Sequence, residues 1–456
     1  MQIIVVGCGK MGSSLAVQLV AEGHRVTIVD RSESVIEQIS NTQDVIGYVG
    51  NGAVFSVLES AGAKEADLML ALTESDELNL LSCLIAHKIG AKHTIARVRN
   101  PEYAAHMYQI SDDLGLSMAV NPDRQAAEEI ARVLRFPAAM HVELFANGRV
   151  ELVASKLPEN GILNGIPLYE LPQKLGGKVL ICAVERDGTY TIPGGSFVLQ
   201  GGDTIYLAGA PREVAKTLRK AGVLANPVRS VMIGGGGRVS YYLAQELLRS
   251  NLSVKIIERS KERARLMAEL LPDAVILNGD VTDHELLQEE GIENADAFVA
   301  LTGLDEGNIL SALYAKRRKV SKVIAKVNND SLETLVKDVA LDSVISPKRV
   351  ASNRILRYVR SREAGAAHGE IRGLYKIADG SIEVLEFLAG NEDAALLNIP
   401  LKDLKTKKHI LIACIVRNGK AIIPGGMDCI EAGDIVMVVT EQRLMNDLGD
   451  IMEDVR

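Results

Sequence analysis

The first residues that could do chemistry are three glycines near the amino terminus. Gly7, Gly9 and Gly12 follow the apolar run Ile3–Val6 in the spacing GxGxxG. In a dinucleotide-binding fold the first glycine permits a tight turn, the second admits a pyrophosphate, and the third lets the helix pack closely on its strand. The helix that follows would point its N–H groups and positive dipole end at the phosphates. The spacing therefore predicts nucleotide binding, with a turn used only for packing as the alternative.

A carboxylate follows at the place that a ribose requires. Asp30 ends the apolar segment RVTIVD, 23 residues after Gly7. A carboxylate there accepts hydrogen bonds from ribose hydroxyls and would repel a 2′-phosphate, so NAD(H) is expected rather than NADPH. Asn51, in the segment GNGA, could contact the adenosine. It could equally be a turn residue bonded to its own backbone.

More polar residues follow the next apolar runs. Thr73 and Glu74 come directly after LMLAL, and Arg97 ends TIAR. Ligands of parallel sheets bind at the carboxyl ends of the strands, and an arginine there can reach a phosphate with its planar fork. Pairing of Arg97 with a surface acid is the alternative. Lys10 is not a P-loop lysine, because the spacing GxxxxGK[ST] is absent, so ATP is expected at most as a ligand.

The whole pattern occurs twice in the chain. Gly7 and Gly235 lie 228 residues apart, as do Asp30 and Glu258. The segment YTIPGGSFVLQGGDTIYLAG likewise aligns with AIIPGGMDCIEAGDIVMVVT, 231 residues later. Such self-similarity indicates a tandem duplication.

Each half of the duplication has two parts. Residues 1–135 and 228–360, the N-modules, alternate Val/Ile/Leu-rich runs with helical segments, which predicts an α/β fold with a doubly wound, Rossmann-like parallel sheet. Residues 140–224 and 368–456, the C-modules, are strand-rich with turn signals such as IPGG, which predicts a small α+β module.

Each N-module is expected to end in a helix that begins at a proline. The segments RQAAEEIARVLR and RVASNRILRYVR, after Pro122 and Pro347, are predicted to cross between neighbouring modules and transmit a conformational change. An ordinary surface helix is the alternative. The apolar residues expected at the interface are Ile130, Val133, Leu134, Ile355, Leu356 and Val359. A charged substitution at Ile130 is then expected to break assembly.

Composition and cysteine spacing exclude several classes of function. The chain has 456 residues and a formal net charge of −8, which gives no basic surface for nucleic acid. Its five cysteines contain no CxxC pair, so neither a zinc site nor a disulfide framework is indicated. The start MQIIVVGCG lacks the basic leader of a signal peptide, and no segment approaches the ~18 apolar residues of a membrane helix.

The C-modules offer no shared acid or base. His141, His368 and His409 do not align between the halves, and the repeated IPGG carries no titratable group. Since a dehydrogenase needs an acid or base near its nicotinamide, we expect a protein that is not an enzyme. An NAD-dependent oxidoreductase is the alternative.

The order of these motifs resembles the family of RCK (KTN) domains. GxGxxG, the terminal acid, LALT…D…N, IARVRN, a proline-marked helix and an IPGG/GD module occur in that order, twice, over essentially the whole chain. This tandem arrangement is similar to that of the regulatory subunits of Trk-type bacterial potassium uptake systems.

The resemblance implies N-modules that bind NAD(H) or ATP/ADP and C-modules like other regulatory domains. It also implies a homotetrameric ring, docked through a TrkH/TrkG-type channel subunit on the cytoplasmic face of the cell membrane. A subunit of another cation transporter or antiporter is the alternative.

The resemblance also implies the binding residues. The first site would comprise Gly7, Cys8, Gly9, Lys10, Met11, Asp30, Asn51, Thr73, Glu74 and Arg97. The second site would comprise Gly234, Gly235, Gly236, Gly237, Arg238, Val239, Glu258, Asp280, Thr302 and Lys326. Ser240 replaces the third glycine of the second turn, and Lys326 keeps a positive charge without the arginine fork. We therefore expect the two sites to differ in affinity or selectivity.

Overall fold

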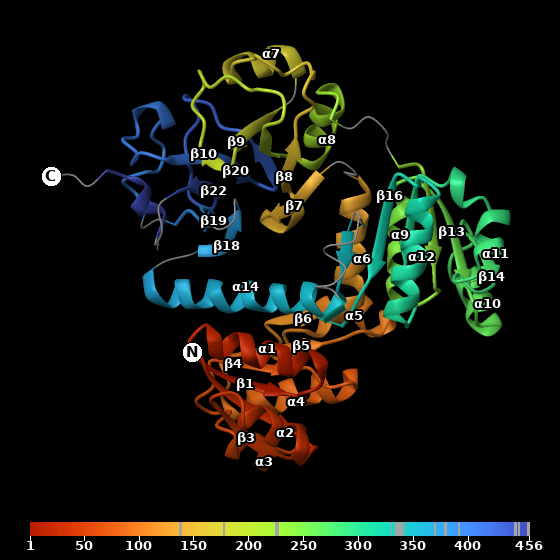
Figure 1. Cartoon of the computed structure of the whole chain (residues 1–456). Helices are drawn as coiled ribbons and strands as arrows, with labels where there is room; N and C mark the ends of the chain where they lie inside the picture. Colours follow the sequence, from red (N-terminus) through yellow and green to blue (C-terminus); the bar gives the residue numbers. More distant parts are fainter. Residues whose placement is uncertain are drawn as a thin grey trace. The chain divides into compact units, whose positions relative to one another are not determined.

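A computed structural model describes most of the chain (Figure 1). The described residues are 1–135, 139–176, 178–223, 228–329, 331–332, 341, 343–368, 371–377, 381–390, 393–441, 445 and 447–453. They form two compact units: Met1–Ala131 with Val228–Leu356, and Arg132–Pro227 with Arg357–Arg456. The first unit therefore pairs the two N-modules, and the second pairs the two C-modules.

The first N-module is a six-stranded parallel sheet in the order β3-β2-β1-β4-β5-β6. Its strands are β1 Gln2–Val6, β2 Arg25–Asp30, β3 Val45–Val49, β4 Leu68–Ala71, β5 His93–Arg97 and β6 Met118–Val120. Its helices are α1 Lys10–Ala21, α2 Glu33–Ser40, α3 Phe55–Ser60, α4 Asp76–Ile89, α5 Pro101–Ile110 and α6 Pro122–Arg135. The strand order reverses between β1 and β4, which confirms the doubly wound prediction.

The second N-module repeats this sheet in the order β14-β13-β12-β15-β16-β17, again parallel. Its strands are β12 Ser230–Gly234, β13 Ser253–Glu258, β14 Val275–Asn278, β15 Ala297–Ala300, β16 Lys322–Lys326 and β17 Ser343–Ile345. Its helices include α9 Arg238–Arg249, α10 Lys261–Leu270, α11 His284–Glu289, α12 Asp305–Arg317 and α14 Pro347–His368. The central strands β4 and β15 are buried along their whole length, as continuous apolar runs require.

The C-modules are antiparallel, five-stranded sheets in the orders β10-β9-β11-β8-β7 and β18-β19-β22-β20-β21. The first comprises β7 Ala139–Phe145, β8 Val150–Lys156, β9 Val179–Arg186, β10 Thr189–Thr191, β11 Thr204–Gly209 and the helices α7 Leu171–Leu175 and α8 Pro211–Lys220. The second comprises β18 Ile371–Ile377, β19 Ile382–Leu388, β20 Ile410–Arg417, β21 Lys420–Ile422 and β22 Ile435–Thr440. One apolar core joins them and contains the thiols Cys182 and Cys414, one from each module. Residues from both repeats thus complete this core.

The proline-marked helices α6 and α14 bury most of the residues expected at an interface, and burial of this kind is shared by a crossing helix and an ordinary surface helix. Ile130, Leu134, Ile355, Leu356 and Val359 are buried within the single chain. Val133, the sixth residue expected at an interface, is half-buried. A charged substitution at Ile130 would therefore disturb the fold of the chain itself, before it could report on assembly. Within the described residues, no helix combines the length and the apolar character needed to cross a bilayer.

Candidate nucleotide sites

The first glycine turn joins β1 to α1. Gly7 has a φ of +89°, in the region that favours glycine, and its N–H donates to the carbonyl of Val29 at 2.9 Å. A Cβ atom on Gly7 would lie 2.7 Å from the Thr73 nitrogen, and one on Gly12 would lie 2.0 Å from the Gly7 oxygen. A Cβ on Gly9 would meet nothing within 4 Å. Packing therefore requires Gly7 and Gly12, whereas the backbone at Gly9 is open to a ligand.

The carboxylate of Asp30 stabilises this turn by accepting hydrogen bonds from the backbone. Its Oδ2 accepts a hydrogen bond from the N–H of Cys8 at 2.7 Å, and its Oδ1 accepts one from the N–H of Ser32 at 2.9 Å. Each carboxylate oxygen has a second lone pair, so the expected contacts to ribose hydroxyls remain available. Asp30 thus has a structural task that its position at the end of a strand did not reveal.

The side chains of residues 8, 10 and 11 have different surroundings. Cys8 and Met11 are buried in the core, so only their backbone lines the turn. Burial, followed by the negative charge of Asp30, raises the pKa of the Cys8 thiol to about 12. The thiol therefore stays protonated at neutral pH and is no nucleophile. Lys10, in contrast, is exposed at the start of α1.

The second glycine turn, between β12 and α9, repeats the first with one change. Gly235 has a φ of +97°, and its N–H donates to Ile257 O at 2.7 Å. Glu258 takes the role of the bracing acid, with its Oε2 2.6 Å from the N–H of Gly236 and its Oε1 2.7 Å from the N–H of Ser260. Ser240, in place of the third glycine, is fully buried and its hydroxyl donates to Gly235 O at 2.5 Å. The turn thus accommodates a serine by bonding its hydroxyl. Gly237, like Gly9, has open space around its Cβ position.

Asn51 and Asp280 occupy equivalent turns, and both bond to their own backbone. The Oδ1 of Asn51 accepts from the N–H of Ala53 at 3.1 Å, while the Oδ1 of Asp280 accepts from the N–H and hydroxyl of Thr282 at 2.9 and 2.8 Å. These bonds hold the pKa of Asp280 below its usual range. The turn-residue alternative thus describes their contacts, and a contact with adenosine stays a prediction.

A buried asparagine ties together the strand ends of the first site. Asn79, on α4, is completely buried, and its Oδ1 accepts from the N–H and hydroxyl of Thr73 at 2.8 and 2.7 Å. Its Nδ2 donates to the carbonyls of Thr73 and Arg97 at 3.1 and 2.9 Å. The carbonyl of Glu74, next in the chain, accepts from the Arg99 guanidinium at 2.9 Å. Asn79 is the final residue of the motif LALT…D…N, and no role was predicted for it from the sequence.

Asn308 makes the same four bonds in the second site. Its Oδ1 accepts from the N–H and hydroxyl of Thr302 at 2.8 and 2.7 Å, and its Nδ2 donates to the carbonyls of Thr302 and Lys326 at 3.2 and 2.9 Å. This repetition was the available signal, because the same asparagine occurs at the equivalent position of both repeats. Each asparagine fixes the strand ends where the candidate ligand residues lie.

Arg97 and Lys326 end equivalent strands as largely desolvated cations. Burial, followed by the charge of Arg99, lowers the pKa of Arg97 to about 10, and its guanidinium donates to Thr73 O. Within the described part of the chain its Nε is buried without a hydrogen-bond partner. Burial likewise lowers the pKa of Lys326, whose Nζ donates to Leu301 O at 3.4 Å. Two cations that have lost much of their water suit an anionic ligand at this edge of each sheet.

The carboxyl edge of each N-module also meets the other N-module. Asp123, at the start of α6, forms an ion pair with Arg238 of the second glycine turn at 3.1 Å. Next to it, the Nδ2 of Asn121 donates to the hydroxyl of Tyr242 at 3.1 Å. Sequence reasoning missed these contacts, because nothing in a single repeat shows which residues of the other repeat it will meet.

Models of two domain families match the chain, each of them twice. The TrkA-N domain matches residues 3–122 and 231–347, and the TrkA-C domain matches residues 152–222 and 386–452. The four matches alternate in the order that the duplication requires.

Similar proteins of known name share nearly the full length of the chain. A Trk system potassium uptake protein TrkA of Haemophilus influenzae is 31% identical, over 96% of this chain and 95% of its own. Its namesake from Vibrio alginolyticus is 30% identical, over 99% of each chain. A TrkA homolog of Archaeoglobus fulgidus is 35% identical, over 96% and 97%.

Solved structures share the fold at lower identity. The GsuK RCK domain covers 96% of this chain and 92% of its own, with a TM-score of 0.61 and 18% identity. The GsuK channel bound to NAD covers 96% of this chain and 76% of its own, with a TM-score of 0.62 and 20% identity. The tandem RCK architecture expected from the motif order is therefore confirmed.

Proposed function

Because the chain belongs to the TrkA family of Trk-system potassium uptake proteins, we propose that it is a nucleotide-binding regulatory subunit that gates a potassium transporter. Its ligands are NAD(H), ATP or ADP, held at the two glycine turns. The observation that carries this proposal is the repeated site: an open glycine backbone, a bracing acid and a desolvated cation, held at the carboxyl edge of each sheet.

The proposed partner is a potassium-conducting membrane subunit of the TrkH/TrkG type. The chain works on the cytoplasmic face of the membrane, as a homotetrameric ring of RCK modules attached through that partner. The family supports this assignment, since the relatives are named for potassium uptake. The apolar core that the two C-modules share makes them one compact unit, from which such a ring can be built.

The nucleotide acts as an effector rather than as a reactant. A ligand shifts a two-state assembly only by binding one arrangement more tightly than the other. Helices α6 and α14 begin at the carboxyl edges where the nucleotides would bind, so they are the proposed transmitters. At the first turn the one thiol, Cys8, is buried and protonated, which supports a role without covalent chemistry.

The proposal is tested with alanine at the two open glycines. Gly9 and Gly237 have negative φ values and empty space at their Cβ positions, so alanine should fold there while blocking the approach of a pyrophosphate. Gly194, in the first C-module, also has empty space and serves as the matched control. Nucleotide affinity is measured by calorimetry, and potassium uptake is measured in cells that lack the gene.

We expect Gly9→Ala and Gly237→Ala each to weaken nucleotide binding at their own site at least about tenfold. The Gly194→Ala chain should restore uptake at limiting external potassium, and the double variant should not. Uptake that is indifferent to the gene would refute the transport function. NADH consumption with a panel of carbonyl substrates would instead favour the oxidoreductase alternative.

A further inference from the structure

The start of α6 meets the second glycine turn through a charged contact. The carboxylate of Asp123, on α6, lies 3.1 Å from the Nε of Arg238, the first residue of α9. One turn further along α9, the hydroxyl of Tyr242 accepts a hydrogen bond from the Nδ2 of Asn121 at 3.1 Å. Two contacts therefore connect the start of α6 to a helix of the other N-module.

The ion pair engages a cation that a nucleotide could use. Arg238 directly follows Gly237, whose Cβ position is open, so its side chain begins beside the backbone that a pyrophosphate would approach. The Arg238 side chain is 50% exposed, whereas that of Asp123 is 20% exposed. The guanidinium is therefore accessible to a phosphate while it is paired with the carboxylate.

A phosphate can displace this carboxylate. The Oδ2 of Asp123 is buried and has no hydrogen-bond partner among the described residues, so charge rather than an aligned hydrogen bond holds it near Arg238. Partly exposed ion pairs are weak, whereas a phosphate can accept two aligned hydrogen bonds from a guanidinium. The exchange leaves Asp123 without this counter-charge, and that cost lowers the affinity for the ligand.

The charge of Asp123 acts more strongly at the second site than at the first. Burial lowers the pKa of Lys326, and the charge of Asp123, followed by that of Asp305, opposes this shift. Burial, followed by the charge of Arg99, lowers the pKa of Arg97, and the acids that oppose this shift are, from strongest to weakest, Asp76, Glu74 and Asp123. Asp123 is thus the leading acid at Lys326 and the weakest of three at Arg97.

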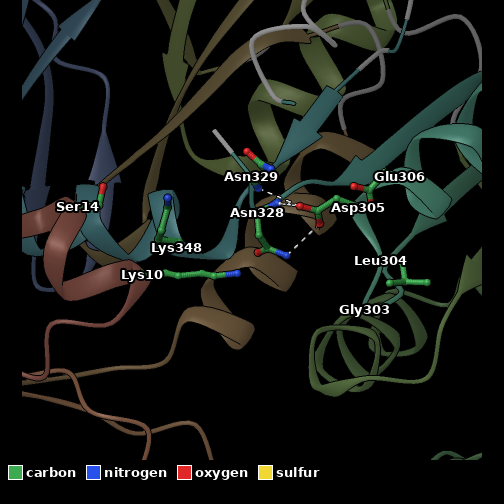
Figure 2. A pocket seen from close by; sticks show the side chains of 9 residues that line it. All are labelled: Lys10, Ser14, Gly303, Leu304, Asp305, Glu306, Asn328, Asn329 and Lys348. Atoms are coloured by element: carbon green, nitrogen blue, oxygen red, sulfur yellow. Dashed lines mark hydrogen bonds between the residues drawn. The ribbon is translucent and has the colours of Figure 1, made fainter. Parts of the chain in front are cut away.

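The first glycine turn meets charges of both signs. In the repeat, Lys10 corresponds to Arg238 and Lys348 corresponds to Asp123. The charged residues that line a cavity of about 490 Å³ beside the first turn are Lys10, Asp305, Glu306 and Lys348 (Figure 2). The Oδ2 of Asp305 accepts from the backbone N–H groups that follow β16, at 2.8 and 2.9 Å. The position that carries an acid at the second turn therefore carries a lysine at the first.

We infer that Asp123 is a displaceable counter-ion of Arg238 and lowers the affinity of the second site for the phosphates of its nucleotide. It is a positioning residue, because it acts through Arg238 and does not itself contact the ligand. A purely structural role for the pair would predict weaker binding when Asp123 is replaced, whereas competition predicts tighter binding. This inference rests on the proposed nucleotide-binding function.

The test uses the full chain that carries Gly9→Ala, so that the second site is observed alone. Asp123→Asn is compared with Glu128→Gln, a control that removes one negative charge from an exposed ion pair of the same helix. Both changes are repeated together with Arg238→Met, which completes a double-mutant cycle. Affinities for ADP and NADH are measured by calorimetry, and melting temperatures check that each variant folds.

Asp123→Asn should tighten the binding of ADP and NADH at least about threefold, while Glu128→Gln changes it less than about twofold. Arg238→Met should weaken binding, and Asp123→Asn should then bring no gain, because the competing pair no longer exists. In a chain that carries Gly237→Ala instead of Gly9→Ala, the gain at the first site should be smaller.

Unchanged or weaker binding in Asp123→Asn would overturn the inference. So would a gain that persists with Arg238→Met, or one that Glu128→Gln or the first site matches, because each would show a general effect of charge. A chain with Gly9→Ala alone that binds neither nucleotide would instead overturn the proposed function at this turn.

Discussion

The two glycine turns are held in the same way but meet different surroundings. In both, a strand-terminal acid accepts hydrogen bonds from the turn, and a buried asparagine joins the neighbouring strand ends. They differ in the third small residue, Gly12 against Ser240, and in the facing residue of the other N-module, Lys348 against Asp123. The comparison teaches that a duplicated chain can keep the hydrogen bonds that hold a turn in place while it changes a packing residue of the turn and the residues that the turn meets.

The largest expected effect contrasts the two small residues. Gly12→Ala should destabilise the chain by about 3 kcal/mol, because its Cβ would lie 2.0 Å from Gly7 O and the helix must move. Ser240→Ala should cost only about 1 kcal/mol, for one lost hydrogen bond. Urea unfolding of each variant measures the difference. Equal costs would show that α1 can shift to admit a Cβ atom at little cost, as α9 already does at Ser240.

A smaller effect tests whether the buried asparagines stabilise the two sites equally. Asn79→Ala and Asn308→Ala should each cost about 2–3 kcal/mol, because each leaves buried N–H and carbonyl groups of two strand ends unpaired. The two losses should agree, since the bond lengths agree. Chemical denaturation checks this, with Asn353→Ala on the exposed side of α14 as a control. A large loss at only one of them would show that the repeats are not braced equally.

The smallest effect concerns acid sensitivity. The pKa of Asp280 is lowered in the folded chain, so its contribution to stability is full above the unfolded value of about 4 and is lost as the pH falls through the folded value. Its counterpart Asn51 does not titrate. Asp280→Asn should therefore reduce the loss of stability below about pH 4. Melting temperatures measured between pH 3 and 7 for the variant and the unchanged chain check this. If the variant lost as much stability at low pH as the unchanged chain, the hydrogen bonds from Thr282 to Asp280 would not contribute to stability.

Much of the architecture could be predicted from the sequence. The apolar runs at β1, β4 and their repeats predicted parallel strands, because strands buried on both faces are continuous in apolar residues. The spacing of Gly7, Gly9 and Gly12 predicted a tight turn, and the structure contains that turn with a positive φ at Gly7. The ligand roles of the individual site residues remain predictions.

Other features escaped the sequence for a physical reason. No role was predicted for Asn79, which is completely buried because its side chain donates to the carbonyls of two strand ends. Cys8 and Met11, assigned to the ligand, turn their side chains into the core, because only the backbone of the turn faces outward. Hydrogen bonds between distant strand ends depend on spacing in three dimensions, which local patterns do not encode.

The sequence by itself determined the duplication, the parallel sheets and the two glycine turns. These features follow from local rules: the period of apolar residues, and the backbone freedom of glycine where a side chain would clash. Only the tertiary structure decided which residues of one repeat face the glycine turn of the other. That choice set Lys348 beside Lys10 and Asp123 beside Arg238, because the packing of two domains brings together residues more than a hundred positions apart.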